Sequence, residues 1–527
     1  MAKTIDFFFS LLTLFLTGVL LVLAFPNYHL TWLAWIAFVP LLIGIRGRKP
    51  WQAFLMCWFC GVVFYFAITP WISDFPSISR PASWLGYLYL SLYFALFGLF
   101  LTLILRRIEV PLLVAAPIWV VFEYLRSNLL FLSFPCVLLG HTQYLNLPII
   151  QIASFTGVYG VSFVIMLTNG AITDLINCWV DKKRQRHPTN SHLQAYNPFY
   201  GGLVVLAIFL VLWVAGWRTL SWENSGRPFS VAVVQGNIPQ EIKWNREYRE
   251  KIISKYENLT EEAAKANPKL IAWPEASTPG FVLKDMTLLQ RMVSIVRRSN
   301  AHLLVGSAEY PKFDKALAKK KKSGNTALFL SPEGKILGQY IKIRLVPFGE
   351  YVPFEGSIPW PEFIVRKDMT SHISGEKPTL FEIDGTKFGT LICWEILFPD
   401  LIRSFVKKGA GFVINISNEA WFGKSAVPHQ ILSMSIFRAV ENRVNLVRAT
   451  NTGVSCFIDP YGRITNRITN GDEDIFIAGT LTQEIRLSPP GTFYTRYGDV
   501  LAYGCIAFSL GLVIWVSFKR TFGNSHA

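Results

Sequence analysis

The chain has 527 residues and a formal net charge of +16, yet 51% of its residues are hydrophobic and only 16% are charged. A soluble globular chain carries roughly 25% charged residues, and a disordered chain is poor in hydrophobic residues, so the composition excludes both classes. It indicates instead a membrane protein with an additional polar part. The seven cysteines are scattered along the chain and do not form a disulfide framework.

Long apolar runs occur almost entirely before residue 218, with one more after residue 498. Each is close to the roughly 17–25 residues that an α-helix needs to cross a bilayer. The run 129–139 is shorter and is interrupted by Phe134-Pro135, so we expect it to be re-entrant or interfacial. We expect eight transmembrane helices, at about 8–25, 30–45, 53–73, 84–105, 111–126, 149–176, 200–217 and 500–518.

Basic residues in the short loops predict the orientation, because Lys and Arg accumulate on the cytoplasmic side of a membrane. With the N-terminus inside, the outer short loops contain only Arg80 and Arg126. The cytoplasmic loops then contain Lys3, Arg46, Arg48, Lys49, Arg106, Arg107, Lys182, Lys183, Arg184, Arg186, Lys519 and Arg520. We therefore expect a membrane domain at 1–217 with seven helices, an outer domain at 218–498, and an eighth helix with a cytoplasmic tail at 499–527.

Within 218–498, short β-rich runs alternate with amphipathic helical runs. The predicted strands are 229–235, 270–273, 303–307, 327–331, 336–343, 388–393, 412–417, 446–450, 454–458 and 475–480. The predicted helices cover about 246–266, 283–299, 396–408 and 428–443. Strands that alternate with helices and are then followed by tandem strands predict one layered α/β sandwich domain.

Three stretches place a reactive side chain at the end of a predicted strand. Glu275 follows the apolar run 270–274, and a half-buried carboxylate there can act as a base, because desolvation favours uptake of a proton. Lys342 lies within an otherwise apolar strand. Cys393 ends strand 388–393 and precedes a helix, where a helix N-terminus and a nearby lysine are expected to lower the pKa of a thiol.

Each of these signals alone has an ordinary structural explanation, as a core cysteine, a capping glutamate or a lysine that extends to solvent. Together and in this order, Trp-Pro-Glu, Lys-x-x-Leu-Val-Pro-Phe-Gly-Glu and Cys-x-Glu resemble the Glu-Lys-Cys triad of the nitrilase, or carbon–nitrogen hydrolase, superfamily. The resemblance covers about 228–482. It implies a nitrilase-like αββα sandwich in which Glu275 is the general base, Lys342 stabilises the oxyanion and Cys393 attacks an acyl carbon.

One branch of that superfamily has seven membrane spans before the nitrilase-like domain and one after it. The chain resembles this branch, the apolipoprotein N-acyltransferases of the Gram-negative inner membrane. Four further stretches agree with the resemblance: 234–239 together with Trp244, 417–423, 428–430 and 448–453. Trp394 stands where the family often has Tyr, so a stacking role for the ring is retained and a role for a phenolic hydroxyl is not.

The resemblance implies acyl transfer in two steps, with the catalytic domain in the periplasm and both termini in the cytoplasm. Cys393 takes an acyl chain from a phospholipid as a thioester, and the N-terminal amine of a diacylglyceryl apolipoprotein then attacks that thioester. Trp244 and Trp394 are candidate supporting residues. Glu350 and Glu395 would orient Lys342 or the amine, unless they are ordinary solvated or capping glutamates.

The stretch 347–378 has little regular pattern, and loops of this length are usually functional. We expect it to be a lid with aromatic anchors at the membrane interface. The candidate anchors are Phe348, Tyr351, Phe354, Trp360 and Phe363. No cluster of His, Cys and Asp has the spacing of a metal site, and no nucleotide-binding signature occurs, so we expect no metal and no cofactor.

Two other functions stay open at this point. A membrane-anchored amidohydrolase of the nitrilase type would use the same triad but would pass the acyl group to water. A transporter or scaffold whose outer domain only binds would not depend on Cys393. Nucleic acid is not an expected partner outside the cytoplasm, whereas the anionic headgroups of a lipid bilayer attract a basic outer domain.

Overall fold

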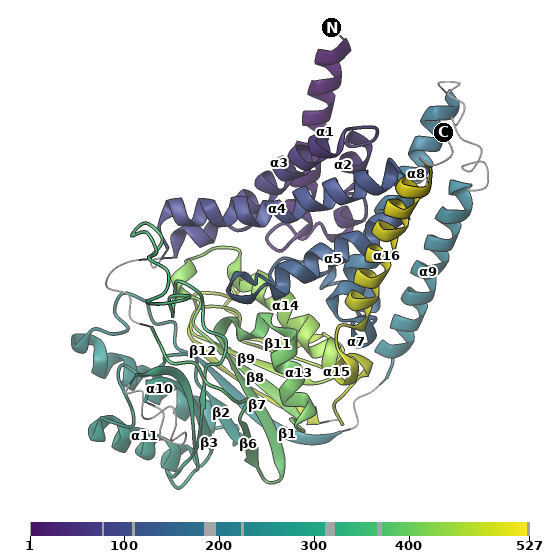
Figure 1. Cartoon of the computed structure of the whole chain (residues 1–527). Coiled ribbons are helices and arrows are strands. Elements are labelled where there is room, and N and C mark those ends of the chain that lie inside the picture. Colours follow the sequence, from purple (N-terminus) through teal and green to yellow (C-terminus); the bar gives the residue numbers. More distant parts are fainter. Residues whose placement is uncertain are drawn as a thin grey trace. The chain divides into compact units, whose positions relative to one another are not determined.

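The computed structural model divides into two compact units, one formed by 1–73, 80–221 and 497–527 and the other by 74–79 and 222–496. We call the first the helical unit and the second the sheet unit (Figure 1). The structure describes residues 2–75, 78–107, 111–183, 197–222, 226–310, 322–365, 371–487 and 489–523.

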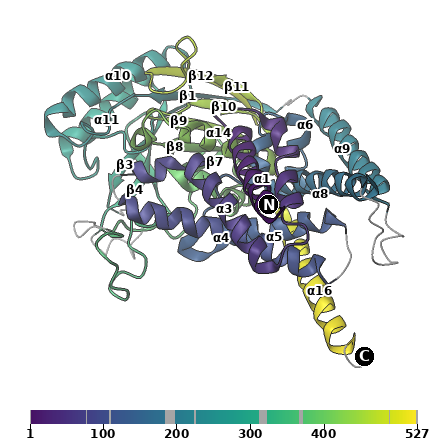
Figure 2. The ribbon, with the colours of Figure 1, turned by 90° about the horizontal axis from the view of Figure 1, so that it is seen from above.

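Five described helices of the helical unit are long and apolar enough to cross a membrane. Their sequences are apolar on all sides, which is typical of helices whose surroundings are lipid or other apolar helices. α8 and α9 lie side by side (Figure 2). The five helices are α3 (Pro50–Ile68), α4 (Arg80–Leu105), α8 (Val158–Lys183), α9 (Pro198–Leu220) and α16 (Val500–Gly523).

Several of the expected spans are not single helices, so the expected count of eight spans is not confirmed. The span predicted at 30–45 consists of η1 (Thr31–Trp35) and α2 (Val39–Gly44), and Pro40 lies in the first turn of α2. Proline suits a helix start but cannot continue a helix from preceding residues. The span predicted at 149–176 is divided by Gly157, whose positive φ of 65° ends a short helix.

The remaining helical segments of this unit are short, except for the first. Residues 129–139, expected to be re-entrant or interfacial, contain no long helix. These segments are α1 (Ala2–Ala24), η2 (Pro70–Asp74), η3 (Leu112–Val114), α5 (Ala115–Asn128), η4 (Leu130–Leu132), η5 (Leu139–Gln143), α6 (Leu147–Ile150) and α7 (Ala153–Thr156).

Arg126 was expected in an outer loop, but it lies in the last turn of α5 and is only 3% exposed. Its guanidinium donates a hydrogen bond to the hydroxyl of Tyr65 on α3. Nearby, Oε1 of Glu123 accepts the backbone N–H of Leu139 at 2.6 Å. Arg126 is therefore a buried residue of the helical unit rather than a loop residue, and its acceptors are the hydroxyl of Tyr65 and the backbone oxygen of Val137.

The sheet unit contains two six-stranded sheets of matching design. In each sheet three neighbouring strands are parallel, and the strands outside them are antiparallel. The first sheet has the order β12 (Gly479–Leu487), β1 (Arg227–Gln235), β2 (Leu270–Ala272), β3 (His302–Glu309), β4 (Gly324–Leu330), β5 (Ile336–Ile341). The second has the order β11 (Ile464–Arg467), β10 (Cys456–Ile458), β9 (Asn445–Thr450), β8 (Phe412–Ser417), β7 (Thr386–Ile392), β6 (Leu380–Ile383).

The two sheets pack face to face, and helices cover their outer faces. Between the sheets, Phe229 packs on Phe412 with ring centroids 5.2 Å apart. The first sheet forms an apolar core with the buried faces of α10 (Arg249–Ala264) and α11 (Met286–Ser299), which Figure 1 shows side by side. The second sheet is contacted by α13 (Pro399–Lys407) and α14 (Val427–Asn442). The expected four-layer αββα sandwich is confirmed.

The sheet design places several strand ends at one edge. β1, β2 and β3 run parallel, and β5 has the same direction because two antiparallel pairings separate it from β3. The carboxyl ends of these strands therefore lie at the same edge, and so do those of β7, β8 and β9. Loops that follow these strands can bring distant residues together, which is where α/β proteins place their functional groups.

Candidate active site

Glu275, Lys342 and Cys393 lie in the segments that follow β2, β5 and β7. Glu275 is 6% exposed, and Lys342 is fully buried. Nζ of Lys342 lies 3.6 Å from Oε1 of Glu275, and the charges of both residues act on the thiol of Cys393. Three residues identified from separate motifs are thus brought together, two from the first sheet and one from the second.

The carboxylate of Glu275 is held by hydrogen bonds from both sheets. Its Oε1 accepts the side-chain amide of Asn325 on β4 at 2.5 Å, and its Oε2 accepts the backbone N–H of Asn418 after β8 at 2.8 Å. On β3, a Cβ added at Gly306 would lie 2.2 Å from the carbonyl oxygen of Pro274, so only glycine allows this close approach. Glu275 is therefore fixed in orientation before any substrate binds.

Glu350 contacts Lys342, one of the two groups that it was expected to orient. Nζ of Lys342 donates to Oε1 of Glu350 at 2.8 Å, and the backbone N–H of Val346 donates to Oε2 at 2.8 Å. Burial alone would lower the pKa of Lys342, but attraction by Glu350 and then by Glu275 raises it above its ordinary value. Lys342 therefore remains an ammonium ion between two carboxylates.

Cys393 is the first residue of η8 (Cys393–Leu397), a single turn, and has a positive φ of 55°. This left-handed conformation costs a non-glycine residue about 1–3 kcal/mol and is common at functional sites. The expected lowering of its pKa is wrong. Burial raises the pKa of Cys393, Glu275 raises it further, and Lys342 only partly opposes this. The thiol is therefore neutral at rest and needs a base to become a nucleophile.

Glu395 faces the backbone rather than an open site, and its expected role in orienting Lys342 or the amine stays a prediction. Burial raises its pKa to about 7, although hydrogen bonds from backbone N–H groups oppose the shift. Its carboxylate joins the segment that carries Lys342 to the turn that carries Cys393. The donors are the N–H groups of Ile343 at 2.7 Å, Arg344 at 3.0 Å and Ile392 at 2.7 Å, and the hydroxyl of Tyr340 at 2.9 Å.

We expect Glu395→Gln to lower the free energy of unfolding by about 2–4 kcal/mol, because a buried amide group would then face N–H donors that it cannot satisfy. Denaturant titration of the full chain in detergent, followed by tryptophan fluorescence, measures the change. Glu382→Gln on β6 is the matched control, because Glu382 is exposed and should change stability by less than about 0.5 kcal/mol. Equal stability of the two variants would contradict this role for Glu395.

Of the two tryptophans named from the sequence, Trp394 directly follows Cys393, whereas Trp244 is not next to any of the three candidate residues in the chain. Trp394 donates from Nε1 to the carbonyl oxygen of Arg344 at 2.7 Å and packs edge-on against Phe398, with ring centroids 5.2 Å apart. Its ring therefore has a packing role without a phenolic hydroxyl. Trp244 is 50% exposed, and its neighbour Lys243 points inward and is 2% exposed.

The sequence did not predict several buried charged residues that act on Glu275 or on Cys393. Nζ of Lys243 donates to the backbone oxygen of Glu275 at 3.1 Å. Arg448 and Glu419 form a fully buried ion pair at 2.6 Å, and the charge of Glu419 also raises the pKa of Cys393. The stretches 417–423 and 448–453 agreed with the family resemblance, but the sequence did not show that Glu419 and Arg448 form a pair. The pairing of β8 with β9 brings these two side chains together.

The expected lid is described at 347–365 and 371–378 and contains no helix or strand of its own. Trp360 packs edge-on against Phe348, with centroids 5.2 Å apart, and its Nε1 donates to the oxygen of Pro353 at 2.7 Å. Tyr351 is partly buried. Phe354 and Phe363 are 54% and 46% exposed, so these two rings are the ones that can meet a surface outside the loop.

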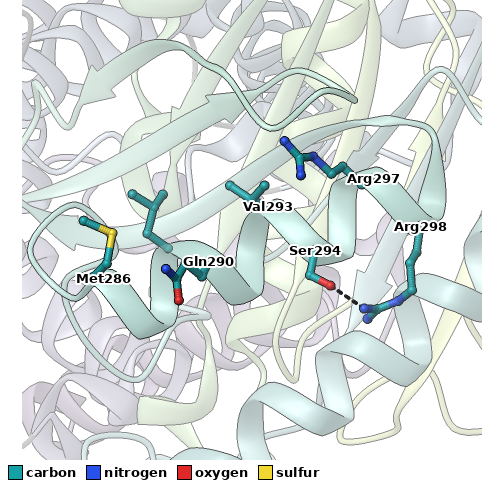
Figure 3. A pocket seen from close by; sticks show the side chains of 7 residues that line it. Met286, Gln290, Val293, Ser294, Arg297 and Arg298 are labelled. Carbon is teal, nitrogen blue, oxygen red and sulfur yellow. Dashed lines mark hydrogen bonds between the residues drawn. The ribbon is translucent and has the colours of Figure 1, made fainter.

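The side chains of α11 border a hollow whose lining residues are distinct from the candidate residues (Figure 3). In it, Arg298 donates to the hydroxyl of Ser294 at 2.5 Å. None of Glu275, Lys342 and Cys393 lines this hollow. Within the part of the chain that the structure describes, no group of three His, Cys, Asp or Glu side chains could hold a metal ion.

Two family descriptions match the chain. "Carbon-nitrogen hydrolase" matches residues 230–488, and "Apolipoprotein N-acyltransferase N-terminal domain" matches residues 17–171. Among solved structures, the chain is similar to a variant of the Nesterenkonia AN1 amidase from the nitrilase superfamily, at 18% identity and a TM-score of 0.38. That match covers 52% of this chain and 95% of the amidase.

Curated relatives match over nearly the full length. The apolipoprotein N-acyltransferase of Geobacter metallireducens is 37% identical over 515 residues, which cover 96% of this chain and 94% of the relative. The protein of that name from Azotobacter vinelandii is 31% identical, covering 95% of this chain and 94% of the relative. The one from Nitrosomonas europaea is 30% identical, covering 95% of this chain and 96% of the relative.

Proposed function

The chain belongs to the apolipoprotein N-acyltransferase family, and from this premise we propose the route by which it acylates lipoproteins. It takes an acyl chain from a phospholipid, holds it as a thioester on Cys393, and passes it to the N-terminal amine of a diacylglyceryl-cysteine. One observation carries the proposal. A buried ammonium, that of Lys342, lies 2.8 Å from Glu350 and 3.6 Å from Glu275, and the charges of Lys342 and Glu275 both act on the neutral thiol of Cys393.

In the first step the thiol gives its proton to Glu275 while its sulfur attacks the ester carbonyl carbon of the phospholipid. The resulting oxyanion is stabilised by the ammonium of Lys342 and by the backbone N–H of Trp394, the residue after the nucleophile. The ester C–O bond then breaks. The departing alkoxide of the lysophospholipid takes the proton from Glu275, which leaves the carboxylate ready for the second step.

In the second step the neutral α-amine of the diacylglyceryl-cysteine attacks the thioester carbonyl carbon. Glu275 accepts the proton that the nitrogen loses, and the C–S bond breaks. The sulfur of Cys393 then recovers a proton from Glu275, so the enzyme returns to its starting state. The Glu275 carboxylate is held in place by one hydrogen-bond donor from each sheet. This fixed position supports its use in both steps.

The long apolar helices support a location in the bilayer, where both lipid substrates reside. Membership of the family suggests the Gram-negative inner membrane as the location. From the distribution of basic residues in the short loops, we propose that the sheet unit lies in the periplasm and both termini in the cytoplasm. A thioester is hydrolysed by water, so a site at the membrane surface must also exclude water. The segment 347–378 is the proposed lid.

Phe354→Ala combined with Phe363→Ala is expected to reduce acyl transfer from phospholipid vesicles by about 10²–10⁴-fold at limiting lipid, because each ring contributes about 1.5–3 kcal/mol of apolar burial. Initial rates against vesicle concentration measure the effect, which should appear mainly in KM. Leu337→Ala on β5, a residue of similar exposure outside the lid, is the control and should retain the wild-type KM. An unchanged KM in the double variant would rule out the lid as a membrane contact.

The products of a single assay distinguish the proposed function from the amidohydrolase alternative. The full chain is incubated with vesicles of acyl-labelled phospholipid, with and without a diacylglyceryl-cysteine peptide. We expect the label in an amide on the peptide, with little free fatty acid formed when the peptide is absent. Rapid release of free fatty acid regardless of the peptide would favour transfer to water and would contradict the proposal.

A further inference from the structure

Lys243 is a buried cation that the mechanism above does not use. It lies in the loop between β1 and η7 (Arg246–Tyr248), and its side chain is 2% exposed. Among the described residues, the only hydrogen bond of its ammonium goes to the backbone oxygen of Glu275 at 3.1 Å. An ammonium carries three N–H donors, so burial with a single partner is unfavourable unless nearby negative charge compensates for it.

The charges around Cys393 supply that compensation. Glu275 follows β2, Glu350 follows β5 and Glu419 follows β8, and each raises the pKa of Cys393. Glu419 is neutralised by its ion pair with Arg448. On the turn of Cys393 itself, Glu395 is engaged by backbone N–H groups.

Lys243 changes the net charge of the groups around Cys393. Lys342 alone faces two carboxylates, those of Glu275 and Glu350, so this group carries one net negative charge without a second cation. A negative site disfavours both a thiolate and an oxyanion. Lys243 interacts with Glu275 and with Cys393, and burial lowers its pKa to about 8 against that attraction. With Lys243 protonated, the group is neutral.

We propose that Lys243 is a positioning residue of the acyl-transfer site, whose ammonium holds the Glu275 segment through its backbone oxygen and offsets the negative charge that opposes ionisation of Cys393. The inference rests on the proposed role of Cys393 as the nucleophile. When the S–H bond breaks and the proton moves to Glu275, the new negative charge on sulfur replaces the one lost from the carboxylate. With Lys243 protonated, the group formed by both lysines, both carboxyl groups and the thiol therefore has a net charge of zero before and after the proton moves.

The test uses alkylation of Cys393 by iodoacetamide, because this reaction requires the thiolate but neither phospholipid nor peptide. The full chain in detergent is labelled between pH 6 and pH 10, and the peptide that contains Cys393 is quantified by mass spectrometry. Lys243→Gln keeps an N–H donor for the oxygen of Glu275 and removes the charge. Lys243→Arg keeps the charge.

We expect Lys243→Gln to slow alkylation about 10-fold at pH 7, where Lys243 is still protonated, equivalent to raising the apparent pKa of the thiol by about one unit, and Lys243→Arg to remain within about 3-fold of wild type. Lys255→Gln on α10, a partly buried lysine outside the site, is the matched control and should match wild type. Cys456 on β10 is fully buried and reports unfolding, so its peptide should stay unlabelled.

Two results would overturn the proposal. If Lys243→Gln reacts at the wild-type rate at every pH while Cys456 stays protected, the charge of Lys243 does not act on the thiol. If Cys456 becomes reactive in Lys243→Gln, Lys243 is a structural residue. Failure of the proposed function is separate, because an effect of Lys243 on alkylation can be present in a chain that never forms an acyl thioester from phospholipid.

Discussion

Cys393→Ala is expected to lower acyl transfer to the peptide by about 10⁴–10⁶-fold, to the background of the assay, because no other described group at the site can form a covalent bond with the acyl chain. The measurement is the initial rate of amide formation from labelled phospholipid. Glu275 and Lys342 lie together in buried positions, but the alanine variant has no thiol nucleophile for them to activate.

Two further variants make this result specific to the sulfur of Cys393. Cys178→Ala removes an exposed cysteine of the helical unit and should leave the rate at the wild-type value. Cys393→Ser keeps the size and a proton but offers a far weaker nucleophile, so its rate should lie near that of Cys393→Ala. Substantial acyl transfer by Cys393→Ala would favour a binding protein or a direct transfer between substrates.

Glu275→Gln is expected to lower acyl transfer by about 10²–10⁴-fold at pH 7, because the amide keeps the shape of the carboxylate but cannot accept the proton of the thiol. The variant should also respond to pH differently from wild type. Glu275 raises the pKa of Cys393, so removing its charge lowers that pKa. The rate of the variant should then rise about 10-fold per pH unit as hydroxide replaces the missing base, until the thiol ionises.

The pH profile separates loss of a base from loss of structure. Because Asn325 and the backbone of Asn418 donate to Glu275, the variant also replaces one hydrogen-bond acceptor by a donor, which could shift the segment. A displaced segment would lower the rate equally at every pH. Glu382→Gln is the control for the substitution itself, since its side chain is exposed on β6. A variant rate that is low and independent of pH would contradict the role of Glu275 as the base.

Much of the sheet unit could be predicted from the sequence, and the errors fall at the edges of the two sheets. β6 and β11 were not predicted, and the last strand was expected at 475–480 but covers 479–487. All three are edge strands, as the strand orders show. Edge strands pair on one side only and carry polar residues, so they lack the continuous apolar pattern of the central strands.

The sequence motifs predicted that Glu275, Lys342 and Cys393 form one site, and the fold places each of them in a segment that follows a strand; their catalytic roles stay predictions. The residues that contact them could not be predicted. Lys243 precedes Trp244 in a loop without periodicity, and nothing local indicates that its ammonium is buried. Asn325 lies within β4, 50 positions from the carboxylate it contacts. The pKa of Cys393 was expected to fall, but burial outweighs the single short turn that follows it. Such effects depend on which distant segments the fold brings together.

The central claim is a covalent acyl group on Cys393, and intact-mass analysis of the full chain tests it most directly. After incubation with excess phospholipid and no peptide, we expect a mass increase equal to one acyl chain, removed by neutral hydroxylamine and absent from Cys393→Ala. Adding the diacylglyceryl-cysteine peptide should discharge it. A wild-type mass that stays unchanged under phospholipid excess, while acyl transfer to the peptide proceeds, would contradict the thioester route.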